Sequence, residues 1–454
     1  MFSNLLLSTD SYKHSHFLQA PPNTSKCYHY LEARSSKNFP EVTFFGLQYL
    51  LEQLAGTAVF TQDIDEAEQI CALHGIPFNK AGWDLLKSRH GGSLPVEVKA
   101  VPEGTTVPVG NILLSVENTD PDFYWLPGFL ETLIVQACWY PSTVCTLSRG
   151  IKKTIHKFLV ETGDEAGLPF KLHDFGFRGV SSYESAAIGG AAHLVNFSGT
   201  DTMAALSLIR HYYDTVDPQA YSIPASEHST ITSWGPENEQ AAYENLLDKY
   251  PTGLVACVSD SYNIYNALEV IWGTNLKEKV LNRNGTLVIR LDSGDPTTMV
   301  IDALEILTRK FGYEVNSKGY KVLPPQVRIL QGDGVNANSI TNILTEMAKH
   351  KYSASNIAFG MGGALLQSIN RDTLGFAYKQ SWACVNGIGR DVYKDPISDQ
   401  GKTSKRGRLS LIESMGTLKT VREDATSDLL RTVFKNGEII VTDTFATIRK
   451  RAEL

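Results

Sequence analysis

The segment Thr286-Leu-Val-Ile-Arg-Leu-Asp-Ser-Gly-Asp-Pro296 shows the pattern that organises the middle of the chain. An apolar run ends at Asp292, a turn containing glycine follows, and Asp295 and Pro296 are typical first residues of a helix. Apolar residues then recur at helical spacing, at Val300, Ala303, Leu304 and Leu307. The segment therefore predicts a buried strand followed by an amphipathic helix.

Three further apolar runs are each followed by a turn with glycine, serine or acidic residues. They are Gly253–Val258, Gln326–Leu330 and Asn356–Phe359. After Asn338, a second amphipathic set follows at Ile340, Ile343, Leu344 and Met347. Alternation of strands and helices predicts βαβ units and a parallel sheet. Four weaker runs bring the number of candidate strands to eight, at Lys171–Asp174, His193–Phe197, Tyr221–Pro224 and Phe376–Val385. The fold class is therefore α/β, and eight strands favour a β/α barrel, which places its active site where strands end.

The two ends of the chain have a different pattern. Short strand-like runs at Val96–Val101 and Thr106–Val116 precede a helical stretch at Phe129–Cys138, and the tail after Val385 returns to loops and short strands. We expect residues 166–385 to form the barrel. Residues 1–165 and 386–454 are expected to form one mixed, β-rich domain together.

Composition limits the partners. The chain of 454 residues has 42 Lys and Arg against 49 Asp and Glu, a net charge of −7, which argues against nucleic acid as a partner. Six scattered cysteines predict neither a disulfide framework nor a zinc site. We expect no membrane span, because the most apolar window, Phe123–Tyr140, contains Pro127 and Glu131. With no signal peptide visible, the expected location is cytoplasmic.

Two glycine turns follow neighbouring strands. Gly360-Met-Gly-Gly363 opens onto a predicted helix start, and Gln331-Gly-Asp-Gly334 adds a carboxylate. Free backbone N–H groups at such turns suit a phosphate. The alternative is that the glycines only turn the chain, but two turns on adjacent strand ends favour a phosphosugar.

Other candidates lie at strand ends and in loops. Arg290 and Asp292 would bind phosphate and ribose or magnesium, or form an internal ion pair. Arg178 follows two aromatic residues, which suit a planar ligand or ordinary packing. His228 is a candidate acid, base or nucleophile, although most histidines have no chemical role. The basic loop Gln400–Arg408 would cover a polyanion or be a solvated surface loop.

Taken together, these segments resemble the nicotinamide phosphoribosyltransferases, which belong to the type II phosphoribosyltransferase family. The ordered matches run nearly end to end, at Leu5–Lys13, Pro21–Lys26, Lys171–Gly179, Ser222–Thr230, Arg290–Gly294, Gln331–Gly334, Gly362–Gly363 and Tyr393–Pro396. The resemblance implies a β/α barrel with a mixed, β-rich second domain, in a homodimer with shared active sites. It also implies that nicotinamide and 5-phosphoribosyl 1-pyrophosphate (PRPP) react, with Mg²⁺, to give nicotinamide mononucleotide and pyrophosphate in NAD salvage.

The resemblance assigns roles residue by residue. Phe175 and the partner subunit's Tyr12 would stack on the pyridine ring, and Asp201 would accept from the carboxamide. Phosphate and pyrophosphate would be held by Arg178, Arg290 and Arg371. The ribose 5-phosphate would be seated by Asp292, Gly332, Asp333, Gly362 and Gly363. Basic residues from the partner subunit would be Arg34, Lys379, Lys394 and Lys402. His228, beside Glu227, would be phosphorylated by ATP as a co-substrate.

This sequence departs from the family pattern at three positions. Asn263 occupies a position where animal enzymes are expected to have Asp, so Asp260 becomes the expected helper of His228. Phe170 and Phe177 replace expected tyrosines. The direct magnesium ligands are not assigned.

Two other functions fit parts of the same pattern. A nicotinate-using phosphoribosyltransferase has a similar fold, but Asp201 argues against a carboxylate substrate because like charges would meet. A non-catalytic nucleotide-binding protein would keep the pocket, and the presence of Asp201, His228, Arg290 and Asp292 argues against it.

Overall fold

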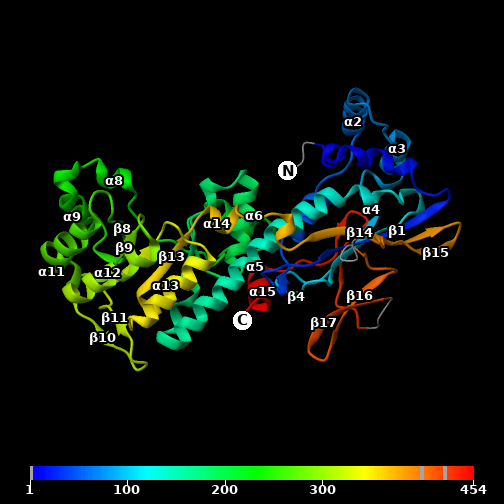
Figure 1. Cartoon of the computed structure of the whole chain (residues 1–454). Coiled ribbons are helices and arrows are strands. Elements are labelled where there is room, and N and C mark those ends of the chain that lie inside the picture. The colour runs from blue at the N-terminus through cyan, green and yellow to red at the C-terminus, as the bar shows by residue number, and fades with distance from the viewer. Residues whose placement is uncertain (1–3, 399–402, 423–426) are drawn as a thin grey trace. The chain divides into compact units, whose positions relative to one another are not determined.

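The computed structural model of the chain describes residues 4–398, 403–422 and 427–454, and these residues form two units (Figure 1). The antiparallel unit consists of Met1–Thr146, Leu208–Val216 and Ile369–Glu453. The barrel unit consists of Leu147–Ser207 and Asp217–Ser368, with Leu454. These boundaries differ from the expected ones, since the barrel unit ends at Ser368 instead of Val385.

The barrel unit is built on a parallel six-stranded sheet in the order β7-β6-β13-β12-β9-β8. The strands are β6 (Leu172–Asp174), β7 (Gly199–Thr200), β8 (Thr252–Val258), β9 (Asn284–Leu291), β12 (Val327–Gln331) and β13 (Ile357–Met361). Ile329 pairs with Ile289 on one side and Ile357 on the other, and all three are buried. Burial of both faces explains why these strands are almost continuously apolar.

The segment 221–226 joins the two edge strands. Tyr221 bridges Gly199 of β7, and Ala225 bridges Ala256 of β8. Backbone hydrogen bonds support both bridges, including Thr200 N to Tyr221 O at 3.0 Å and Ser226 N to Ala256 O at 3.0 Å. The predicted run at Tyr221–Pro224 therefore takes part in the sheet as single bridges and not as a full strand.

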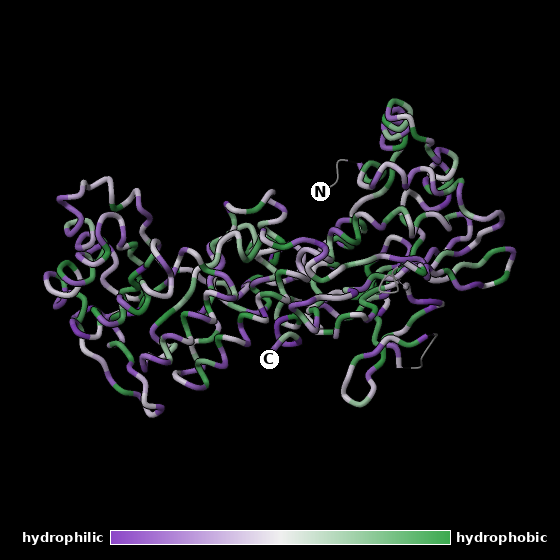
Figure 2. The backbone as a smooth tube through the Cα atoms, viewed as in Figure 1, coloured by the Kyte–Doolittle hydropathy of each residue, from purple (hydrophilic) through white to green (hydrophobic). Residues whose placement is uncertain are grey.

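Amphipathic helices follow the strands as predicted. The Asp295 side chain caps α12 (Pro296–Phe311), and the Asn336 side chain caps α13 (Ala337–Lys349). Both predicted apolar stripes are buried. Along these helices the tube of Figure 2 changes repeatedly between hydrophobic and hydrophilic colours. The other α-helices of this unit are α6 (Tyr183–Leu194), α8 (His228–Thr232), α9 (Glu239–Lys249), α10 (Ile264–Asn266), α11 (Lys277–Leu281) and α14 (Gly363–Leu366).

The antiparallel unit has a seven-stranded sheet in the order β15-β14-β1-β5-β3-β18-β19. Its strands are β1 (Thr24–Ala33), β3 (Val96–Ala100), β5 (Ile112–Asn118), β14 (Phe376–Val385), β15 (Ile388–Asp391), β18 (Arg431–Lys435) and β19 (Glu438–Ile439). Two small sheets pair β2 (Glu41–Thr43) with β4 (Thr106–Pro108) and β16 (Leu409–Ser414) with β17 (Thr417–Arg422). Because β18 pairs with β3, the tail returns to the N-terminal sheet.

The helices of this unit are α1 (Leu47–Ala55), α2 (Thr61–His74), α3 (Lys80–His90), α4 (Leu126–Phe129) and α15 (Phe445–Arg451). Two longer helices contribute residues to both units, α5 (Glu131–Thr162) and α7 (Met203–Tyr212). No helix in the described ranges combines the length and the apolar character that crossing a membrane requires.

Two of the eight predicted strands, His193–Phe197 and Tyr221–Pro224, are not strands, and a third lies in the other sheet. His193–Phe197 is not a strand, because α6 continues to Leu194 and the His193 ring is buried against the Ser148 hydroxyl. Phe376–Val385 is a strand, but it pairs antiparallel with β1 and so belongs to the other sheet. Its alternating burial fits that sheet, whose strands need not be covered on both faces.

Candidate active site

Polar side chains gather at the carboxyl edge of the parallel sheet. Because all strands point the same way, the residues that follow them meet at one edge. Phe175 follows β6, Asp201 follows β7, Asp260 follows β8, Asp292 follows β9 and Asp333 follows β12. The strands thus position most of the predicted residues of this unit.

Arg290 and Asp292 form a two-pronged ion pair. Arg290 Nη2 lies 2.8 Å from Asp292 Oδ1 and 2.9 Å from Oδ2. Gly332 lies against this pair, since a Cβ there would be 2.6 Å from Asp292 Oδ1. The pair matches the internal ion pair that the sequence left open, but the Arg290 side chain is still a quarter exposed. Its remaining N–H groups can therefore bind an anion.

His228 lies at the start of α8, between two carboxylates. Its Nε2 is 2.9 Å from Asp260 Oδ1, and its Nδ1 is 3.9 Å from Asp292 Oδ2. Asp260 is nearly buried, whereas about half of the histidine ring is exposed. Asn263 has a different role, because it caps α10 by accepting from Asn266 N at 3.1 Å. The geometry therefore pairs His228 with Asp260.

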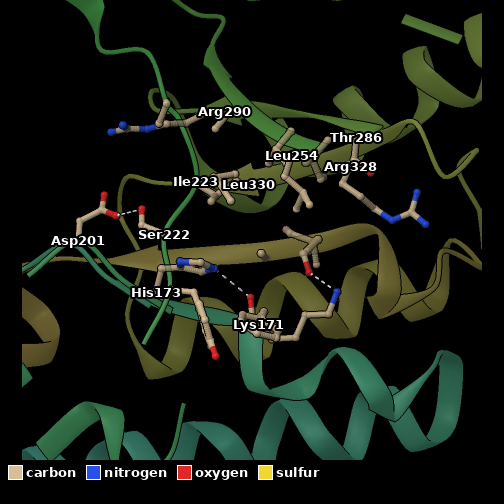
Figure 3. Close-up of a pocket in the computed structure, with 18 of the residues that line it drawn as sticks. Lys171, His173, Asp201, Ser222, Ile223, Leu254, Thr286, Arg290, Arg328 and Leu330 are labelled. Atoms are coloured by element: carbon tan, nitrogen blue, oxygen red, sulfur yellow. Dashed lines mark hydrogen bonds between the residues drawn. The ribbon is translucent and has the colours of Figure 1, made fainter. Parts of the chain in front are cut away.

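A cavity of about 450 Å³ opens beside these groups and runs along the sheet interior (Figure 3). Phe175, Asp201 and Arg290 line its carboxyl end. Its walls are mainly apolar, and they include Ile223, Ala256, Val288 and Leu330. Such a cavity with few polar groups suits a small, largely apolar ligand that is oriented by hydrogen bonds.

Phe175 presents its ring to this cavity. The Arg290 guanidinium carbon lies 5.6 Å from the ring centroid, within the range of a cation–π contact. Close packing fixes the ring, because a Cβ at Gly360 would lie 2.0 Å from Phe175 Cε2. Gly360 is thus required for the ring position and is not merely part of a turn.

Asp201 is oriented by Ser222, a residue to which the sequence analysis gave no role. Ser222 Oγ donates to Asp201 Oδ1 at 2.5 Å, which leaves Oδ2 for a ligand (Figure 3). His173 lies nearby, and burial lowers the pKa of its imidazole. Both residues belong to motifs that the sequence matched, but only the fold shows that they share a cavity with Asp201.

Two cations lie at the amino end of the same cavity. Lys171 Nζ donates to three backbone carbonyls, the closest being Ile357 O at 2.8 Å. Arg328 Nη1 likewise donates to the carbonyls of Leu323, Pro324 and Val327. Sequence reasoning did not identify either residue, because single cations in strand-like runs carry no motif. Their bonds to the backbone give them a role in closing this end of the sheet.

The remaining predicted residues of the barrel unit lie in loops and short helices. Arg178 is exposed on the short helix η5 (Phe177–Gly179), and Glu227 is exposed before α8, where it accepts from Ser229 Oγ. Gly362 and Gly363 connect β13 to α14. Asp333 is exposed after β12.

Five predicted residues lie in the antiparallel unit. Tyr12 is exposed on the short helix η2 (Ser11–Leu18). Arg371 Nη2 lies 3.3 Å from Asp372 Oδ1. Desolvation lowers the pKa of Lys379, nearby Arg34, Lys394 and Lys13 lower it further, and Glu131 raises it. Arg34, Lys379 and Lys394 thus form a cationic cluster that has Glu131 beside it. Lys402 lies outside the described residues.

Magnesium would need ligands that substrate phosphates help to supply. The described part of the chain holds no group of three or more His, Cys, Asp and Glu side chains suited to a metal ion. Mg²⁺ often keeps waters and binds through one or two carboxylates plus substrate phosphates. Asp292 and Asp333 place carboxylates at the carboxyl edge, so the donor set fits a magnesium ion carried by a pyrophosphate group.

Comparison with known proteins gives consistent matches. Residues 170–438 match the nicotinate phosphoribosyltransferase family, and residues 4–98 match the N-terminal domain of nicotinamide phosphoribosyltransferase. A Xanthomonas campestris protein named nicotinamide phosphoribosyltransferase is 50% identical, covering 99% of this chain and 98% of its own length. The protein of that name from Acinetobacter baylyi is 31% identical, with 99% and 97% coverage.

Solved structures agree on the fold. Nicotinate-nucleotide pyrophosphorylase from Pyrococcus furiosus superposes with a TM-score of 0.64 at 16% identity, covering 99% of this chain and 94% of that one. Human nicotinic acid phosphoribosyltransferase gives a TM-score of 0.61 at 16% identity, with 98% and 92% coverage. Full-length similarity and the family match lead to one conclusion: the chain belongs to the nicotinate phosphoribosyltransferase family of enzymes.

Proposed function

We propose that this enzyme transfers the 5-phosphoribosyl group of PRPP to nicotinamide, giving nicotinamide mononucleotide and pyrophosphate in NAD salvage. One observation carries the proposal most directly: Phe175, Asp201 and Arg290 line one end of a single cavity. A ring, a hydrogen-bond acceptor and an anion-binding group are what a neutral carboxamide and an activated sugar phosphate require. The names of the two relatives from Xanthomonas and Acinetobacter support the same substrate.

The reaction needs positioning more than proton transfer. The pyridine nitrogen attacks C1 of the ribose while the bond from C1 to the pyrophosphate oxygen breaks. That nitrogen carries no proton in nicotinamide, so no general base is required. Phe175 would stack on the ring and Asp201 Oδ2 would accept from the carboxamide N–H₂, which together aim the nitrogen. A carboxylate in place of the amide would face the charge of Asp201.

The leaving group gathers negative charge as the bond breaks. Arg290 would stabilise that charge beside the ring, and Arg178 would hold a phosphate of the substrate. Bound magnesium supplies further neutralisation of the phosphate oxygens. In a homodimer, the cluster of Arg34, Lys379 and Lys394 would be contributed by the partner subunit, together with Tyr12, Arg371 and Lys402. Desolvation is the largest cause of the lowered pKa of Lys379, and the neighbouring cations add to it.

ATP would act through His228. Asp260 accepts from Nε2, which leaves the lone pair of Nδ1 available. Nδ1 would attack the γ-phosphorus of ATP and release ADP, and water would later hydrolyse the phosphohistidine to phosphate. Glu227 lies next to this histidine in the sequence and is exposed.

The first experiment is to incubate the purified chain with nicotinamide, PRPP and Mg²⁺, with and without ATP, and to measure the mononucleotide and pyrophosphate. The proposal expects both products in equal amounts and a higher yield with ATP. Preference for nicotinate would instead support the acid-using alternative. Binding of the mononucleotide without pyrophosphate release would support a non-catalytic role.

The ATP step has its own test. His228→Ala should lose both the ATP stimulation and the acid-labile phosphate on the protein, while a basal reaction persists. His350→Ala is the control, because His350 is also a half-exposed histidine near a carboxylate, 3.7 Å from Glu305. Undiminished ATP stimulation in the His228 variant would reject the phosphohistidine.

A further inference from the structure

Asp174 is a buried carboxylate directly beneath the nicotinamide-binding groups. It is the last residue of β6, and its side chain is completely buried. It does not line the cavity, so it cannot contact a ligand there. Burying a carboxylate is costly unless hydrogen bonds stabilise it, so its position requires a structural explanation.

The carboxylate stabilises the turn that follows the strand. Asp174 Oδ1 accepts from Gly176 N at 2.7 Å, a side-chain bond to the backbone two residues on. This arrangement is an Asx-turn, which fixes the direction of the chain through Phe175. The turn leads into η5 with Arg178, so one hydrogen bond orients the aromatic ring and the start of an anion-binding segment.

The same residue also anchors the second ligand-binding element. The backbone carbonyl of Asp174 accepts from Asp201 N at 3.0 Å. On the other side, Phe175 N donates to Met361 O at 3.0 Å, which ties the turn to β13. Asp174 therefore bonds to Gly176 through its side chain and to Asp201 through its backbone. It supports both segments that carry the ligand-binding groups.

Packing leaves little room for another arrangement. A Cβ at Gly190 of α6 would lie 3.1 Å from Asp174 Oδ2, and a Cβ at Gly176 would lie 2.7 Å from Leu366 Cδ1. Asp174 Oδ2 itself has no hydrogen-bond partner of good geometry among the described residues. Burial raises the pKa of this carboxyl group to about 6 and nearby Asp201 adds to the rise, whereas the bond from Gly176 N and the nearby hydroxyls of Thr202 and Thr200 oppose it. The fold keeps a costly carboxylate here, and its well-formed hydrogen bond is the one from Gly176 N.

We propose that Asp174 is a positioning residue for nicotinamide, whose carboxylate holds Phe175 in the orientation that stacks on the pyridine ring. The inference rests on the proposed function, since it names the ligand of the same cavity. The oxygen acceptor at Oδ1 holds the ring in place, and the negative charge is not needed. A neutral side chain that keeps an acceptor at this position is therefore expected to preserve nicotinamide binding.

Two pairs of variants separate the acceptor from packing. Asp174→Asn keeps an oxygen acceptor at nearly the same volume, whereas Asp174→Leu removes it and leaves Gly176 N–H buried without a partner. Asp174→Ser and Asp174→Ala form a smaller pair, in which only serine can accept from the backbone. The smaller pair gives the same comparison if the leucine variant does not fold. Asn356→Leu is the control, because Asn356 is fully buried and accepts from Leu323 N at 2.9 Å at the amino end of β13.

The readout is the Michaelis constant for nicotinamide. The Michaelis constant for PRPP and the midpoint of thermal unfolding are measured on the same variants. We expect Asp174→Leu to raise the nicotinamide constant at least about tenfold, and Asp174→Asn to change it by less than about threefold. Asn356→Leu should lower the midpoint without changing that constant. An unchanged constant in the leucine or alanine variant overturns the inference, and so does an asparagine variant as impaired as leucine. An inactive wild-type chain would instead reject the proposed function.

Discussion

Two groups of charged side chains, one in each unit, are arranged differently. In the barrel unit, cations face carboxylates at the edge of the sheet, as Arg290 does with Asp292 and His228 with Asp260. In the antiparallel unit, burial lowers the pKa of Lys379, nearby Arg34, Lys394 and Lys13 lower it further, and Glu131 partly offsets them. Under the proposed function this difference is a division of roles, in which the paired charges would position a neutral ring and a sugar and the clustered cations would bind a polyanion.

Removing the paired cation of the barrel unit should have the largest effect. Arg290→Ala takes away a guanidinium beside Phe175 and leaves Asp292 without its partner. We expect kcat/KM for pyrophosphate release to fall about 100- to 1,000-fold, the loss seen when one preorganised charge-stabilising group is removed. Arg309→Ala is the matched control, because Arg309 forms an exposed ion pair with Glu269. A loss below about threefold in the Arg290 variant would show that this pair is only structural.

Neutralising the cationic cluster should have a smaller and more selective effect. Lys379→Gln should raise the Michaelis constant for PRPP about tenfold while that for nicotinamide stays the same, because a charged contact to phosphate contributes about 1.5–3 kcal/mol at most. The control is Lys80→Gln, which alters an exposed lysine of the same unit near Asp65. Equal changes in the Michaelis constants for PRPP and for nicotinamide would contradict the separate roles of the two units.

The smallest effect concerns stability in the antiparallel unit. Burial raises the pKa of Glu103 to about 7, and its Oε1 accepts from Gly46 N and Gln48 N. The folded chain therefore holds a proton that the unfolded chain releases above about pH 4.5, so stability is lost as pH rises towards 7. Glu103→Gln keeps the acceptor and should add about 1–3 kcal/mol at pH 8 but little at pH 5. Thermal unfolding at both pH values checks this, and a variant that is less stable at pH 8 would contradict it.

Sequence periodicity predicted the barrel unit well for a physical reason. Strands covered on both faces are continuously apolar, and Asp295 and Asn336 mark the helix starts by capping them. The same rule misplaced β14, because its apolar residues do not reveal whether the neighbouring strand is parallel. The pairing of β14 with β1 brings together residues more than 300 positions apart in the chain, and no local sequence pattern predicts it.

The candidate site was predicted in its residues but not in its contacts. Strand ends and the family resemblance identified Phe175, Asp201, His228 and Arg290. Ser222 and Asp174 were missed as functional residues, because a serine in a loop and an aspartate at a strand end have many uses. Their roles depend on hydrogen bonds to Asp201 and Gly176 that form only when the sheet is assembled.

Under the proposed function, the cavity distinguishes a neutral amide from a carboxylate through Asp201. The most direct measurement compares pyrophosphate release with nicotinamide and with nicotinate, for the wild-type chain and for Asp201→Asn at saturating PRPP. We predict a strong preference for nicotinamide in the wild type and a preference reduced at least about tenfold in the variant, as expected when a like-charge contact is removed. The same ratio of rates in both proteins would contradict the account.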